Sequence, residues 1–201
     1  MKLSGQDRML LLITVLLAAY QVSVGIDGLS TLPIIAYTIA FGVLLVAGLL
    51  LFILGLDVLD SPIVVVISTI IPLSLSIGLV WEYLASYRTP YLLFSIIGFA
   101  TIILTRSFPV PGKLPVVVLA VVHGIAGMTI FLLPIIFALT GQARMGFTLV
   151  GIGGGLIGLG GLLLSFLKTG KPILSRETIF NIFPGLLLVM TTAYVAGFAL
   201  R

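Results

Sequence analysis

The sequence contains no cysteine and few charged residues, and both scarcities narrow its class. Without cysteine the chain has no disulfide, no iron–sulfur ligation and no thiol nucleophile. Only 8% of its 201 residues are charged, against about 25% in an ordinary soluble domain. A soluble fold of this length would therefore lack the polar side chains needed to cover its surface.

The residue groups from which most active sites are built are also missing. The chain has a single histidine, His123, and no cluster of metal-ligating side chains, so we assign no catalytic residue and expect no metal site. Whether the chain is an enzyme stays open. Dense basic clusters with interleaved aromatic residues are absent as well, so we expect no nucleic-acid partner.

Hydrophobic residues make up 60% of the chain, and its mean hydropathy is +1.36. A membrane-spanning helix needs roughly 20 apolar residues, and such runs follow one another with short charged loops between them. We predict an all-α integral membrane protein, a single seven-transmembrane-helix bundle filling residues 1–201, with the lipid bilayer as its first partner. The predicted helices are 9–26, 32–56, 62–85, 90–105, 115–139, 145–167 and 178–200.

The distribution of cations predicts the orientation of the bundle. With the N-terminus inside, seven of the ten Lys and Arg residues fall on the inner side and three on the outer side, which favours an N-in, C-out topology. The inner residues are Lys2, Arg8, Arg106, Lys113, Lys168, Lys171 and Arg176, and the outer ones are Arg88, Arg144 and Arg201. The count depends on the short fourth segment crossing the membrane. The first segment has features of a signal peptide, and we expect it to be a retained helix in a prokaryotic cytoplasmic membrane.

Two pairs of segments suggest an internal repeat. Residues 47–51 resemble 160–164, and residues 70–72 resemble 182–184, at offsets of 113 and 112. One register nearly serves both pairs, so the first three and last three helices would form parallel repeats joined by the fourth, a 3+1+3 arrangement.

Glycines dominate the sixth predicted helix. Their spacing of three or four residues puts them on one helix face, where close packing against another helix is the expected role. The helix-packing candidates are Gly151, Gly154, Gly158 and Gly161. They do not form a nucleotide-binding loop, because no strand precedes them and no Lys-Ser/Thr pair follows.

A few polar residues lie within the predicted spans, where ionisable groups are costly and often functional. Glu82 is the acid inside a span, with Arg88 near enough in sequence to pair with it. His123 lies about two turns into the fifth helix, and Asn181 is predicted at a similar depth. Together with Ser68 they are our candidates for the lining of a ligand site or pathway.

Prolines inside three predicted helices free backbone carbonyls, which must then face protein, water or an ion rather than lipid. The predicted kinks are at Pro72, Pro134 and Pro184.

Three functions fit these features. The first is a small-solute or ion transporter-like protein with a pathway between the two repeats. The second is a non-catalytic subunit or scaffold that binds other membrane subunits or further copies of itself. The third is a pigment protein in which His123 ligates a haem or chlorophyll axially, although no cofactor is required by the sequence.

Overall fold

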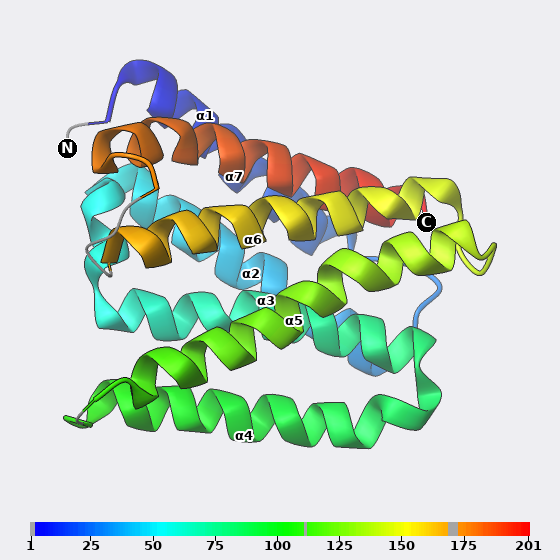
Figure 1. Cartoon of the computed structure of the whole chain (residues 1–201). Coiled ribbons are helices and arrows are strands. Elements are labelled where there is room, and N and C mark those ends of the chain that lie inside the picture. Colours follow the sequence, from blue (N-terminus) through cyan, green and yellow to red (C-terminus); the bar gives the residue numbers. More distant parts are fainter. Residues whose placement is uncertain (1–2, 111, 169–172) are drawn as a thin grey trace.

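The computed structural model describes residues 3–110, 112–168 and 173–201, and in this part of the chain helices joined by loops are the regular secondary structure (Figure 1). Lys2 and Lys171, counted above for the orientation, lie outside the described residues. Seven described helices are long and apolar enough to cross a membrane, as predicted. They are α1 Gly5–Val24, α2 Thr31–Leu54, α3 Pro62–Tyr83, α4 Arg88–Ser107, α5 Leu114–Leu139, α6 Thr148–Lys168 and α7 Arg176–Ala199. Three short 3₁₀ helices join them: η1 Leu56–Asp60, η2 Ala85–Tyr87 and η3 Met145–Phe147.

The first helix begins four residues earlier than its hydropathy predicts. Ser4 is its N-cap, and the Ser4 hydroxyl accepts a hydrogen bond from the Asp7 backbone N–H at 3.1 Å. The Asp7 carboxylate accepts in return from the Ser4 backbone N–H at 2.9 Å. This capping box satisfies two N–H groups that the first turn of a helix leaves open, so the polar residues before the apolar run join the helix.

Replacing Ser4 by alanine is expected to lower the free energy of unfolding by about 1 kcal/mol, because the Asp7 N–H loses its acceptor. Ser23→Ala is the control in the same helix. The Ser23 hydroxyl is exposed and donates to the Ala19 carbonyl, and its loss is expected to cost less than about 0.5 kcal/mol. Unfolding by SDS in mixed micelles, followed by circular dichroism, measures both. Equal losses for the two variants would show that the cap adds nothing.

The fourth helix is longer than predicted. It covers 20 residues rather than the 16 of 90–105, since it begins at Arg88 and ends at Ser107. The N-cap is Tyr87, and Thr89, the residue before Pro90, is already helical. Pro90 thus lies in the first turn, where a missing N–H costs nothing, and the chain passes from η2 directly into a helix long enough to span.

Six of the helices form a closed ring, and α4 lies outside it (Figure 1). Around the ring, α1 packs on α2, α2 on α3, α3 on α5, α5 on α6, α6 on α7, and α7 on α1. The fourth helix packs on α3 and α5 alone among the helices. The start of α1 and the end of α7 lie at opposite ends of the bundle (Figure 1). We call the two ends the Ser4 end and the Arg201 end.

The centre of the ring is filled by apolar side chains, and near the Arg201 end these are mostly aromatic. Phe198 of α7 packs against Tyr37 of α2, with ring centroids 4.6 Å apart, and also contacts Phe41 and Phe147. Tyr83 stacks on Phe137 at 4.8 Å. We call this set the aromatic layer; it consists of Tyr37, Phe41, Tyr83, Phe137, Phe147, Tyr194 and Phe198.

Candidate functional site

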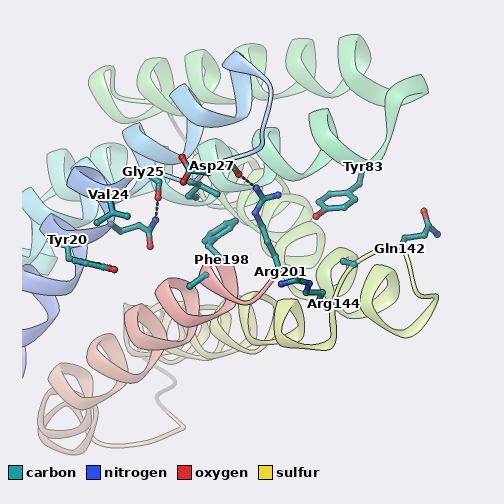
Figure 2. A pocket seen from close by; sticks show the side chains of 13 residues that line it. Tyr20, Val24, Gly25, Asp27, Tyr83, Gln142, Arg144, Phe198 and Arg201 are labelled. Atoms are coloured by element: carbon teal, nitrogen blue, oxygen red, sulfur yellow. Dashed lines mark hydrogen bonds between the residues drawn. The ribbon is translucent and has the colours of Figure 1, made fainter.

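A cavity of about 570 Å³ opens at the Arg201 end of the bundle. Its walls come from four separate parts of the chain, which Figure 2 shows around the end of α7. These are the end of α1 with the loop that follows it, the last residue of α3, the loop between α5 and α6, and the end of α7. The volume is within the range of small-molecule sites. Because the cavity is open rather than enclosed, a solute can enter it without a rearrangement.

Arg201 crosses this cavity and ties α7 to the loop after α1. Its guanidinium donates a hydrogen bond to the backbone carbonyl of Asp27 (Figure 2). The loop can offer this carbonyl because Gly25 and Gly28 have φ angles of 73° and 71°, which turn the chain sharply after the helix. The Gln21 amide donates to the Gly25 carbonyl at 2.7 Å and holds the same turn from inside the helix. The wall on this side is therefore braced by side chains from α1 and α7.

The aromatic layer closes the cavity towards the middle of the bundle. Two of its members, Tyr83 and Phe198, line the cavity directly. Phe198 is only 4% exposed, since Tyr37, Phe41 and Phe147 surround its ring. The floor is thus apolar and aromatic, while the mouth is polar.

Two charged side chains at the mouth have no partner within the described part of the chain. The carboxylate of Asp27 and the guanidinium of Arg144 are both exposed, and neither makes a hydrogen bond or ion pair to another described residue. The nearby Gln142 amide turns instead to the Thr140 hydroxyl, at 3.1 Å. One negative and one positive group are therefore available to a ligand.

Glu82 lies beside the cavity without lining it. It is half-buried at the end of α3, next to Tyr83. No ion pair joins it to Arg88 in the described residues. Arg88 turns towards Trp81, donating to its carbonyl at 2.6 Å and lying 5.6 Å from the centre of its ring. The partner expected from the sequence, Arg88, is thus used elsewhere.

The other three pathway candidates are distributed over different helices and are not brought together at the cavity. The Ser68 hydroxyl donates within α3 to the Val65 carbonyl at 3.0 Å. His123 of α5 is half-buried, and its Nδ1 has no partner among the described atoms. Asn181 is exposed on α7. No hydrogen bond links Asn181 to His123 in the described residues.

The glycines of α6 differ sharply in their surroundings. A methyl group added at Gly151 would lie 2.6 Å from the carbonyl oxygen of Phe131 on α5, and one at Gly154 would lie 2.7 Å from the Ile130 side chain. Gly158 and Gly161 are exposed. Close approach between α5 and α6 is thus confined to the half of α6 nearer the Arg201 end.

A second glycine contact joins α6 to α7. A methyl group at Gly197 would meet the backbone nitrogen of Val150 at 2.6 Å, and one at Gly153 would meet the Tyr194 ring at 2.8 Å.

The three prolines lie inside α3, α5 and α7 at positions 72, 134 and 184. These three helices share one direction along the bundle.

The cavity was missed by sequence reasoning because its polar residues lie just outside the apolar runs. The site candidates predicted from the sequence lie within spans, whereas Asp27, Gln142 and Arg144 belong to loops. Successive membrane-spanning helices run in opposite directions, and this alternation does carry a signal. It places the loops after the first and fifth helices and the end of the seventh helix at the same end of the bundle. Their polar residues are thereby candidates for one site.

No protein-family model matches this chain, and no curated protein and no solved structure matches it either. Among the described residues, no group of three or more His, Asp or Glu side chains is placed to hold a metal ion. The fold itself defines the class: an all-helical chain whose seven long apolar helices are those of a multi-pass membrane protein.

Proposed function

We propose that this protein is a small-solute transporter-like membrane protein, with the cavity at the Arg201 end as its solute site. The observation that carries the proposal is that both halves of the ring build the cavity. Gln21 and Tyr83 come from α1 and α3, whereas Arg144 and Phe198 come from the α5–α6 loop and α7. Transporters built from repeats bind their solute at the interface between the repeats, near the middle of the bilayer, and this cavity lies at the Arg201 end of that interface.

The order of the helices supports the 3+1+3 arrangement. The trio α1–α2–α3 packs consecutively, as does α5–α6–α7, and the trios meet through α3 with α5 and through α7 with α1. If α1, α2 and α3 are exchanged with α5, α6 and α7 respectively, each helix of the ring keeps equivalent neighbours, and α4 stays outside the ring. Under the N-in orientation predicted from the cations, the cavity opens on the outer side.

The closed floor fits one state of an alternating pathway. A cavity open at one end and sealed by the aromatic layer corresponds to a protein loaded from that side. Movement of one trio against the other would separate the rings of Phe198 and Tyr37, which belong to different trios. Solute would then reach the centre of the ring from the cavity.

Labelling of single cysteines tests this pathway, and the absence of native cysteine makes the background clean. Ala199→Cys, in the cavity, is expected to react rapidly with a membrane-impermeant thiol reagent added on one side only. Leu44→Cys lies in the main core and is 4% exposed. We expect slow labelling there, because the layer must open first.

Ile102→Cys is the matched control. Ile102 is 0% exposed but belongs to the second core cluster, which α3, α4 and α5 form away from the ring centre. It is expected to stay unlabelled from either side. If Leu44→Cys is as unreactive as Ile102→Cys, there is no pathway through the ring. An unreactive Ala199→Cys would show that the cavity is not open to water.

The position of α4 supports a second candidate, a subunit of a larger membrane assembly. This helix packs only against α3 and α5 among the helices and exposes large apolar residues such as Leu93, Ile97 and Leu104. Lipid or a partner helix would cover them equally well. The mass of the particle purified in mild detergent tests this second candidate. A stable particle that contains a single chain would contradict the role of an obligate subunit.

A further inference from the structure

We infer that the cavity binds a compact zwitterion, a small molecule carrying both an ammonium and an anionic group, with the ammonium at Asp27 and the anion at Arg144. The inference rests on the proposed solute site and adds the chemical class of its ligand. It starts from the two charged groups at the mouth that no described residue neutralises. Each is a charge without a partner beside a cavity large enough for a small molecule.

The third charged group of the cavity, the guanidinium of Arg201, is held in the wall by a hydrogen bond and keeps its positive charge. Arg201 donates to the Asp27 carbonyl, and it lies close enough to the Tyr83 side chain to interact with it (Figure 2). Its guanidinium is thus part of the wall. The carboxylate of Asp27 and the guanidinium of Arg144 are left to face a ligand, and they have opposite signs. A simple anion would pair with the Arg144 guanidinium but would be repelled by the Asp27 carboxylate.

Helix ends reinforce both poles. Asp27 follows the C-terminal end of α1, whose C-cap is Gly25, and the last turn of a helix carries partial negative charge. The end of α7, at Ala199, also borders the cavity. An ammonium group near Asp27 would therefore meet a carboxylate and two helix C-termini, which offset the positive charge that Arg201 brings to the Asp27 carbonyl.

Arg144 stands at the opposite kind of helix end. It is the N-cap of η3, which leads directly into α6, and the beginning of a helix carries partial positive charge. A carboxylate or phosphate at Arg144 would meet a guanidinium and the start of α6. Both poles of the cavity thus combine a side chain with a helix end of the same sign.

This pattern is the reverse of the one that stabilises helices. Acidic groups favour the start of a helix and basic groups its end, as Asp7 in the first turn of α1 illustrates. Asp27, beyond the C-cap of α1, and Arg144, before α6, do not stabilise those two helix ends. A bound zwitterion would offset both charges at once.

The apolar part of the cavity limits the size of the ligand. Val24 and Phe198 also line the cavity, so a short hydrocarbon linker between the charges is favoured over a polar one. Free amino acids and the headgroup of an ethanolamine lipid share this chemistry. The structure assigns the chemistry, and the test separates the sources.

Binding is tested on the purified full chain by calorimetry, with glycine, β-alanine, 4-aminobutyrate and glycerophosphoethanolamine as zwitterions, propionate as the anion and propylamine as the cation. We expect at least one zwitterion to bind about tenfold more tightly than either singly charged probe, because each satisfied charge contributes separately. Selective binding of glycerophosphoethanolamine would identify a lipid headgroup. Selective binding of an amino acid would identify a free solute.

Two neutral variants locate the poles. Asp27→Asn is expected to weaken zwitterion binding about tenfold while propionate binding stays within about twofold, and Arg144→Gln is expected to abolish propionate binding. Arg88→Gln is the control, since Arg88 lies at the same end but does not line the cavity. Because both side chains are exposed and have no partner in the described residues, the two neutral variants should fold and melt near the temperature of the unmodified protein.

The outcomes separate the two proposals. If propionate binds as well as the zwitterions and Asp27→Asn has no effect, the ligand is an anion; the zwitterion is then wrong while the solute site stands. If no probe binds and Ala199→Cys is unreactive, the solute site itself is wrong. If probes bind equally to all three variants, binding occurs elsewhere and the assignment to this cavity fails.

Discussion

Replacing Gly151 by leucine is expected to lower the free energy of unfolding by about 3 kcal/mol, because the new side chain has no room between α5 and α6. The first added carbon would lie 2.6 Å from the carbonyl oxygen of Phe131. That oxygen is backbone, so the clash is relieved only by separating the helices. A gain in helix propensity of up to about 1 kcal/mol is too small to compensate.

Gly158 provides the matched control one heptad further along the same helix. It is exposed, and a methyl group there would meet no atom within 4 Å. The same change to leucine is expected to leave stability unchanged or to raise it by up to about 1 kcal/mol. SDS titration in mixed micelles, with the fluorescence of the single tryptophan, Trp81, as the signal, measures both. Similar losses at the two sites would show that α5 and α6 do not approach closely at Gly151.

The difference between these glycines shows what a repeating pattern can predict. The spacing of three and four residues places several glycines on one side of α6. It does not say where along the helix a neighbour comes close. Two helices that cross at an angle stay in backbone contact over a few turns only. That range depends on the tertiary fold, which periodicity does not contain.

Helix positions were largely predictable because hydropathy determines where the chain crosses the membrane. The ends of α2, α3, α5 and α7 differ from the prediction by two residues or fewer. The larger differences have local causes. The capping box of Ser4 and Asp7 lengthens α1, and η2 runs straight into α4, so that helix begins at Arg88 rather than at Pro90. Polar residues extended these helices beyond their apolar runs.

The cavity was unpredictable for a different reason. Its walls join residues as far apart as Gln21 and Arg201, and their proximity depends on the ring closing between α1 and α7. The sequence predicts which end of the bundle each loop occupies. It does not predict which helices are neighbours, and therefore does not show that Asp27 and Arg144 share one cavity.

Replacing Tyr194 by phenylalanine is expected to raise the free energy of unfolding by about 1–3 kcal/mol, which is the cost of an unsatisfied buried polar group. Tyr194 is 1% exposed, and its hydroxyl has no hydrogen-bond partner among the described atoms. Phenylalanine keeps the ring, which packs on Gly153 and makes an edge contact with Phe41. The change thus removes the penalty and little else.

Thr191→Val is the control, one turn away on the same helix. Thr191 is 0% exposed, and its hydroxyl donates to the Leu187 carbonyl at 2.8 Å. Removing this satisfied group is expected to lower stability by about 0.5–1 kcal/mol. The two variants should therefore shift SDS unfolding in opposite directions. A loss of stability in Tyr194→Phe would mean that the hydroxyl has a partner beyond the protein side chains, such as an ordered water.

The same hydroxyl connects stability with the proposed pathway. Tyr194 belongs to the aromatic layer, which in the proposed pathway opens before solute leaves the cavity for the centre of the ring. When the layer opens, water or solute can satisfy the hydroxyl, so the closed state pays a cost that the open state avoids. Tyr194→Phe should then favour the closed state and slow the labelling of Leu44→Cys, while Ala199→Cys reacts at its usual rate. Such an exchange of stability for function is common where a protein must move. Unchanged labelling of Leu44→Cys in a stabilised variant would place Tyr194 outside the pathway.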